Sequence, residues 1–189
     1  MRPAGGAARH VRTARSAYRL PPAVEPPGGA PARGREIVVT GAHGGAGTST
    51  LAVLLRNAWD LGVLRRPARG EPAARTGGRP LVLVTRNTAG AAARATAAVD
   101  ALADGGCPVA VLVIVSDGLP DPQAAAYRFR VLAGRAGAVV RVPFIAALRA
   151  ADDPAQVELP RKARRAIADI KAAALAAAGV RPSATPMWR

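Results

Sequence analysis

A glycine-rich segment followed by three hydroxyl side chains is the part of this 189-residue chain best suited to chemistry. It reads His43-Gly44-Gly45-Ala46-Gly47-Thr48-Ser49-Thr50. Glycines let consecutive backbone N–H groups point into one concavity, and a helix that begins directly after them adds unpaired N–H groups and the positive end of its dipole. Such a loop binds phosphate oxygens, and a hydroxyl at its end is a common Mg²⁺ ligand. We expect residues 43–50 to bind phosphate, with Ser49 as the metal ligand.

The residues on either side predict the strand–turn–helix context that such a loop needs. Residues 36–40 form a short apolar run that predicts a buried strand. After Thr48, a helix is predicted because five residues recur on one face at helical spacing, and Gly62 is its expected end; the five are Leu51, Leu54, Leu55, Ala58 and Trp59. The alternative is a glycine-rich turn without a ligand, because glycine is frequent throughout the chain.

Further apolar runs at residues 81–85, 109–115 and 138–142 predict three more strands. Helices are predicted at residues 89–103, after Asp121-Pro122, and at residues 163–178, with Asp121 as an N-cap and Pro122 at the first helical position. Apolar strands that alternate with helices indicate an α/β fold, a mostly parallel sheet with helices on both faces. Ligands of such sheets bind at the carboxyl ends of the strands. The glycine-rich segment follows the first predicted strand, so it lies at such an end.

The segment resembles the deviant Walker A motif of the ParA/MinD family of P-loop ATPases, which usually reads Lys-Gly-Gly-x-Gly-Lys-Thr-Thr. The three glycines and the hydroxyl pair match, whereas His43 and Thr48 stand where the family has its two lysines. The resemblance extends weakly over residues 36–178 and also points to small, uncharacterised MinD-like proteins of conjugative elements in high-GC bacteria. It implies a reduced P-loop NTPase-like domain with ATP and Mg²⁺ as ligands, and a homodimer.

The missing residues change what the resemblance implies about activity. The family carries a switch Asp and an Asp-bearing Walker B strand after its first helix, but residues 64–80 contain no apolar strand that ends in Asp. Loss of the phosphate-binding lysine costs one charge-assisted contact, or about ten- to hundredfold in affinity. Loss of the acids as well removes most of the charge placement that phosphoryl transfer requires. We expect weak ATP binding and little or no hydrolysis.

Three further residues are candidates for the same site. Arg86 follows a predicted strand directly and can replace the lysine as a phosphate ligand, or it can be solvated. Asp117 can accept a hydrogen bond from a nucleotide base, or it can form a turn with Gly118. His43 can contact phosphate in a pH-dependent way, or it can be a solvated loop residue.

Composition sets the remaining expectations. The chain has one cysteine and two histidines, which argues against a disulfide framework or a zinc cluster, and no apolar run reaches the roughly 20 residues of a membrane helix. We expect a cytoplasmic protein with a disordered basic tail at residues 1–35, the α/β domain at 36–178 and a C-terminal tail at 179–189. The net charge is +15, although all but two of the 27 cationic residues are scattered arginines.

Three possible functions follow from these observations. The first is a degenerate ParA/MinD-like protein that serves as a partner-binding or regulatory module for an unidentified protein. The alternatives are a DNA-associated plasmid partition or transfer accessory that uses the basic tail, or an ATPase completed by a partner. DNA binding through the tail would weaken steeply with salt, because it would release counterions from the phosphates.

Overall fold

A five-stranded parallel sheet forms the centre of the protein, and the computed structural model describes residues 37–65 and 72–179. The strands lie in the order β2-β1-β3-β4-β5 and every neighbouring pair is parallel. Their bounds are β1 Ile37–Gly41, β2 Ala58–Val63, β3 Leu81–Arg86, β4 Val109–Val115 and β5 Ala138–Val142. The predicted α/β class with a parallel sheet is therefore confirmed.

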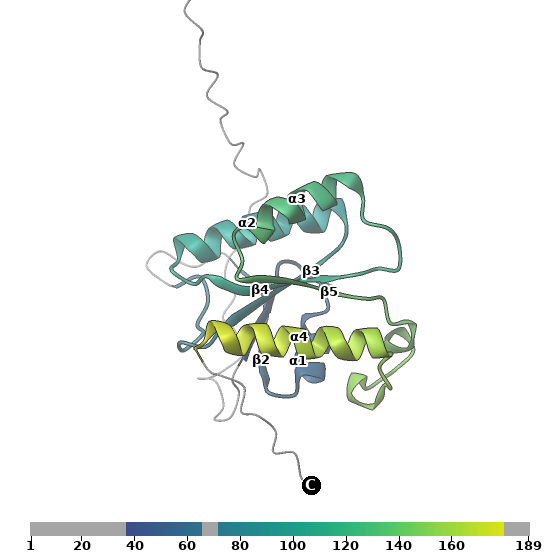
Figure 1. The fold of residues 1–189 in the computed structure, drawn as a ribbon. Helices are drawn as coiled ribbons and strands as arrows, with labels where there is room; N and C mark the ends of the chain where they lie inside the picture. The colour runs from purple at the N-terminus through teal and green to yellow at the C-terminus, as the bar shows by residue number, and fades with distance from the viewer. Residues whose placement is uncertain (1–36, 66–71, 180–189) are drawn as a thin grey trace, which may run out of the picture.

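Helices cover both faces of the sheet (Figure 1). One face packs against α1 (Thr48–Leu55) and α4 (Arg161–Ala177), and the other against α2 (Ala89–Asp104) and α3 (Gln123–Ala133). Two short 3-10 turns, η1 (Ala146–Arg149) and η2 (Pro154–Gln156), lie between β5 and α4. Among the described residues, no helix is both long and apolar enough to cross a membrane.

Aliphatic side chains of the central strands build both halves of the core. Val82 and Val84 of β3 face α1 and α4, whereas Leu81 and Leu83 face α2 and α3, because successive residues of a strand point to opposite faces. With so few aromatic residues in the chain, the opposing helix α2 contributes mainly alanines, which let it approach the sheet closely. The central strands are apolar on both sides, as their sequence indicated.

The prediction of one helix from Thr48 through Trp59 is wrong. The helix α1 ends at Leu55, the chain turns at Arg56 with φ of 63°, and Ala58–Val63 forms strand β2 beside β1. The apolar residues from Ala58 onward fit the spacing of a helix, but they also fit the alternation of a strand, in which successive side chains point to opposite faces. Trp59 and Leu61 pack toward α2 and α3, while Ala58 faces the opposite core.

The order of the strands reverses between β1 and β3. From β1 the chain runs outward to β2 at one edge, and it then returns past β1 to β3, β4 and β5. In doubly wound sheets, ligands bind in the crevice outside the carboxyl ends of the strands at such a reversal. The glycine-rich segment follows β1, and Arg86 ends β3, so both lie at this crevice. The predicted tail at residues 1–35 and residues 180–189 lie outside the described residues.

The connection from β2 to β3 packs closely against the end of α2, which makes Gly105 a sensitive position. A Cβ at Gly105 would lie 2.6 Å from Cβ of Ala73 and 3.0 Å from its backbone nitrogen. We expect Gly105→Ala to lower the free energy of unfolding by about 1–3 kcal/mol, measured by urea denaturation. The control Gly90→Ala lies within α2, with its nearest neighbour at 3.9 Å, and should stabilise the protein by about 0.5–1 kcal/mol. Equal stability of the two variants would contradict this packing.

Candidate functional site

The glycine-rich loop joins the carboxyl end of β1 to the first turn of α1. Gly45 and Gly47 have φ of 74° and 94°, a left-handed conformation that glycine adopts without strain. Gly47 is the N-cap of α1, and no side chain caps the helix there, so the first N–H groups of α1 are not satisfied by a capping side chain. Gly44, Gly45 and Ser49 are exposed, which leaves this end of the helix open to a ligand.

Thr48 occupies the inside of the loop, where the resemblance has its lysine. Its side chain is buried, and a Cβ at Gly41 would collide with Oγ1 of Thr48. Ala46 is also buried, whereas Thr50 is half-buried. Thr48 therefore packs the loop against the end of β1 and brings no positive charge to it. Ser49, the predicted metal ligand, lies on the exposed side of the same turn.

His43 bridges the loop to β3. Its Nδ1 lies 2.8 Å from the carbonyl oxygen of Gly44, and its Nε2 lies 3.4 Å from the backbone nitrogen of Arg86. Because the Arg86 N–H is a donor, Nε2 must accept, which places the proton on Nδ1, where it is donated to Gly44. Burial is the largest cause that lowers the pKa of His43 below 6.5, and the charges of Arg94 and Arg86 act in the same direction. His43 is thus a neutral positioning residue in this arrangement.

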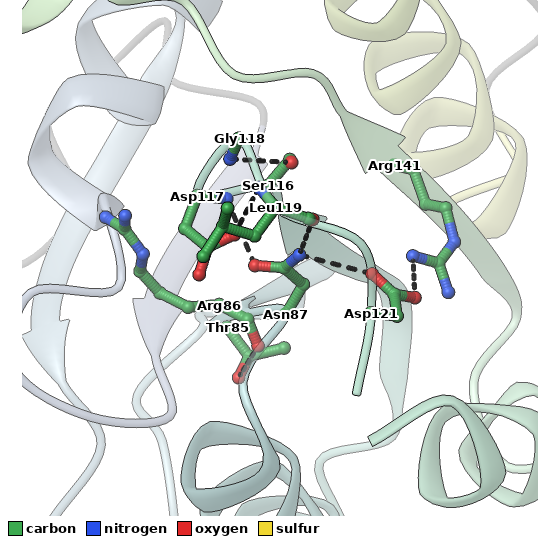
Figure 2. Close-up of polar contacts among 9 residues, drawn as sticks. All are labelled: Thr85, Arg86, Asn87, Ser116, Asp117, Gly118, Leu119, Asp121 and Arg141. Carbon is green, nitrogen blue, oxygen red and sulfur yellow. Dashed lines mark hydrogen bonds and ion pairs between the residues drawn. The ribbon is translucent and has the colours of Figure 1, made fainter. Parts of the chain in front are cut away.

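Arg86 brings positive charge to this crevice, and Arg94 lies close enough to act on His43 as well. Within the described residues, the guanidinium of Arg86 makes no ion pair or hydrogen bond, although Arg86 is half-buried. Its charge lowers the pKa of both His43 and Asp117, so it lies near the loop and near the turn after β4. Figure 2 shows the side chain of Arg86 extended away from Asn87, on the side opposite Arg141. The predicted replacement for the lysine is therefore placed beside the loop.

Asn87 holds the turn between β4 and α3. Its buried amide donates from Nδ2 to the carbonyl oxygen of Leu119 at 3.0 Å and to Oδ1 of Asp121 at 3.2 Å (Figure 2). Its Oδ1 accepts from the backbone N–H of Asp117 at 3.0 Å. Both N–H groups of the amide and its oxygen thus form hydrogen bonds, and these bonds fix the positions of residues 117, 119 and 121 relative to the end of β3. The partners of Asn87 lie 30 to 34 residues away along the chain, so no local pattern in the sequence marks this role.

Asp117 acts within the turn in this structure. Its Oδ1 accepts the N–H of Leu119 at 2.9 Å, and this contact is the main cause that lowers the pKa of Asp117. Gly118 next to it has φ of 94°, and Phe144 lies 3.3 Å from the position of an added Cβ, so glycine is required there. Of the two roles predicted for Asp117, this geometry supports turn formation.

The predicted N-cap role of Asp121 and the predicted first helical position of Pro122 are both wrong. The N-cap of α3 is Pro122, and no side chain caps this helix. Asp121 instead accepts from Asn87 and pairs with Arg141, whose Nη1 lies 2.5 Å from Oδ2. Arg141 also lies over the ring of Phe129 at 6.0 Å. A carboxylate that neutralises Arg141 satisfies more hydrogen bonds than a helix cap would, and no local sequence signal marks this pairing.

An acidic side chain does lie beside β1, in the strand that the sequence did not reveal. Asp60 of β2 is in register with Val39, and its Oδ1 accepts the N–H of Gly62 at 2.7 Å. Thr40 donates to the carbonyl oxygen of Gly62 at 3.1 Å, which ties the ends of the two strands together. One oxygen of this carboxylate is therefore used within its own strand. Nowhere in residues 37–65 and 72–179 do three or more His, Cys, Asp or Glu residues gather as a metal cluster.

No family model, no curated protein and no solved structure matches this chain. The chemistry of the site is therefore inferred from its geometry.

Acid should weaken the contact between His43 and Arg86. Since the pKa of His43 is lowered in the folded protein, the unfolded chain binds more protons, and the free energy of unfolding falls as the pH drops below about 6.5. A proton on Nε2 would also face the Arg86 N–H. We expect His43→Asn to lose this part of the pH dependence, measured by urea denaturation between pH 7.5 and pH 5. Histidine NMR signals should give a pKa below 6.5 for His43, and an unshifted value would contradict the arrangement.

Proposed function

We propose that the protein binds a phosphate-bearing ligand, a nucleoside triphosphate such as ATP, weakly and with little or no hydrolysis. The observation that carries this proposal is the position of Arg86 beside the glycine-rich start of α1, at the reversal of the strand order. Its guanidinium forms no ion pair or hydrogen bond with any residue of 37–65 and 72–179. The open N–H groups of α1 attract an anion, and the guanidinium offers two parallel donors to a phosphate. The alternative, a glycine-rich turn without a ligand, does not account for a half-buried arginine beside the loop whose guanidinium has no partner in the part of the chain that the structure describes.

The ligand would sit between the loop and the end of β3. The backbone of Gly44 to Gly47 would cradle the phosphates, Arg86 would hold one of them, and Ser49 is the residue that fits Mg²⁺. When bound, Mg²⁺ neutralises phosphate charge. Neutral His43 would keep the loop in position against β3, rather than add a charge.

The resemblance to the ParA/MinD family supports this proposal through the loop alone. Thr48 in place of the lysine argues for a binding module, because Thr48 brings no positive charge to the phosphate that would be transferred. In this proposal the protein acts on a partner protein, with the nucleotide as a regulator.

Arg86 should decide whether nucleotide binds. In titration calorimetry of the full chain with ATP and with GTP, with and without Mg²⁺, Arg86→Ala should weaken binding about ten- to hundredfold. Thr48→Lys should strengthen it, provided that circular dichroism shows an unchanged fold. The control Arg130→Ala removes an exposed arginine of α3 and should leave binding unchanged. Equal affinity of Arg86→Ala and the parent chain would refute the role of Arg86.

The purified chain should release no phosphate from ATP above background, because Thr48 stands where the resemblance has its phosphate-binding lysine and residues 64–80 contain no apolar strand that ends in Asp. The measurement is steady-state phosphate release at saturating ATP and Mg²⁺. Turnover that Ser49→Ala abolishes would show an active site, and this part of the proposal would then be wrong.

A further inference from the structure

The strand β5 ends the sheet with one side unpaired. It pairs with β4 from Ala138 to Val142, and no strand of the described residues lies on its other side. The carbonyl oxygen of Val142 accepts a hydrogen bond from the N–H of Ser116, the residue after β4, so the backbone of Val142 points toward β4. Because the direction alternates along a parallel strand, the backbone groups of Val139 and Arg141 point outward. In Figure 1, α3 lies above β5 and α4 below it.

A groove runs along this free edge. It has a volume of about 500 Å³ and lies between β5 and α4. Val139, Val140 and Arg141 line it on one side, and α4 lines it on the other with Lys162, Arg165, Ala166, Asp169 and Ala173. A second hollow of about 310 Å³ shares Arg141 and Lys162 with it and continues to the carboxyl ends of the strands. The five residues of β5 span about 17 Å at the usual rise of a strand. The groove therefore offers an extended chain both backbone partners and an apolar floor.

The rim of the groove is basic. Arg141 and Arg165 each face one acid, Asp121 and Asp169, whereas Lys162 forms no ion pair within the described part of the chain. The first five residues of α4 include four exposed cations and no acid, and two of the four, Lys162 and Arg165, line the groove; the four are Arg161, Lys162, Arg164 and Arg165. Cations at a helix N-terminus oppose the helix dipole and weaken the helix. Their charge thus does not serve α4 itself, and it favours an acidic occupant of the groove.

We propose that the β5 edge is a docking site for an extended, acidic segment of a partner protein, which adds to the sheet as a sixth strand. Main-chain hydrogen bonds to Val139 and Arg141 would provide affinity, and Lys162 would select for carboxylates. This surface is separate from the glycine-rich loop and does not depend on nucleotide.

Charge argues against the chain's own ends and against a second copy of the chain as the segment bound at the β5 edge, and backbone hydrogen bonding argues against a polynucleotide. The segment 1–36 carries seven arginines and two glutamates, and residues 180–189 carry two arginines and no acid, so the chain's own ends are repelled. A second copy paired through β5 would bring two basic rims together. A polynucleotide would match the charge, but it would leave the outward N–H and C=O groups of Val139 and Arg141 without a ladder partner.

The test uses a fluorescein-labelled peptide of eight residues that alternates Val and Glu, with fluorescence anisotropy as the readout on the full chain. The same peptide with Lys in place of Glu, and a version with Pro at alternate positions, should bind about tenfold more weakly or not at all. Amide exchange measured by NMR should slow at Val139 and Arg141 when the acidic peptide is added. An unchanged exchange rate at both amides would overturn the proposal.

Substitutions can separate the contribution of charge to peptide binding from that of the backbone hydrogen bonds. Lys162→Glu should weaken binding of the acidic peptide about tenfold, whereas Lys171→Glu makes the same change on α4 outside the groove and should have little effect. Val139→Pro removes an outward N–H, a change that an edge strand tolerates, and should abolish binding while circular dichroism stays native. Binding that is equal in Lys162→Glu and Lys171→Glu would contradict the rim's role.

Two further outcomes would show that the β5 edge binds a different kind of molecule. If oligothymidylate of eight nucleotides displaces the peptide at equal concentration, the edge is a polynucleotide surface and the proposal is wrong. If sedimentation shows a dimer that Val139→Pro dissociates, the occupant is a second copy and the proposal is also wrong. Arg86→Ala should leave peptide binding intact, so failure of nucleotide binding and failure of this proposal are distinguishable.

Discussion

The parallel pairing of all five strands is the constraint on which the rest of the structure depends. A parallel pair needs a long crossover, so each connection between strands must pass over a face of the sheet. Helices α1 and α4 therefore lie on one face and α2 and α3 on the other, and the central strands become apolar on both sides. The same pairing brings all carboxyl ends to one edge. Polar residues are thus concentrated there, and the reversal between β1 and β3 places the glycine-rich loop and Arg86 together.

At that edge, the buried amide of Asn87 fixes the relative position of the turns. Each of its hydrogen bonds replaces one to water, and loss of a buried partner costs about 1–3 kcal/mol. Through Leu119 and Asp117 it sets the turn after β4, and through Asp121 it sets Arg141 at the sheet edge. On the other side, the backbone of Arg86 meets His43 of the loop. Two consecutive residues of one strand end therefore organise both the loop and the turn.

The sequence predicts what depends on local pattern and fails where distant partners decide. Residues 109–115 are recognisable as a strand because an unbroken apolar run of this length suits a strand buried on both faces. The boundary between α1 and β2 is not, because Ala58 and Trp59 fit helical and alternating periods alike, and the turn occurs at Arg56 without Gly or Pro. The glycine-rich loop is visible as a motif. The pairing of Asp121 with Arg141 spans 20 residues, and no local signal distinguishes it from a helix cap.

The rigidity of Asn87 also bears on how the loop and the β5 edge relate. They are connected by continuous contacts, from His43 through residues 86 and 87 to Asp121 and Arg141. Contacts transmit a signal only where an element has two arrangements of similar free energy. Asn87 is buried with both its donors and its oxygen engaged, and a second arrangement would leave these groups unpaired. A phosphate at Arg86 would also engage the guanidinium, which points away from Asn87 (Figure 2). The strand end is therefore a fixed support between the loop and the β5 edge, and the two proposed binding surfaces would act independently.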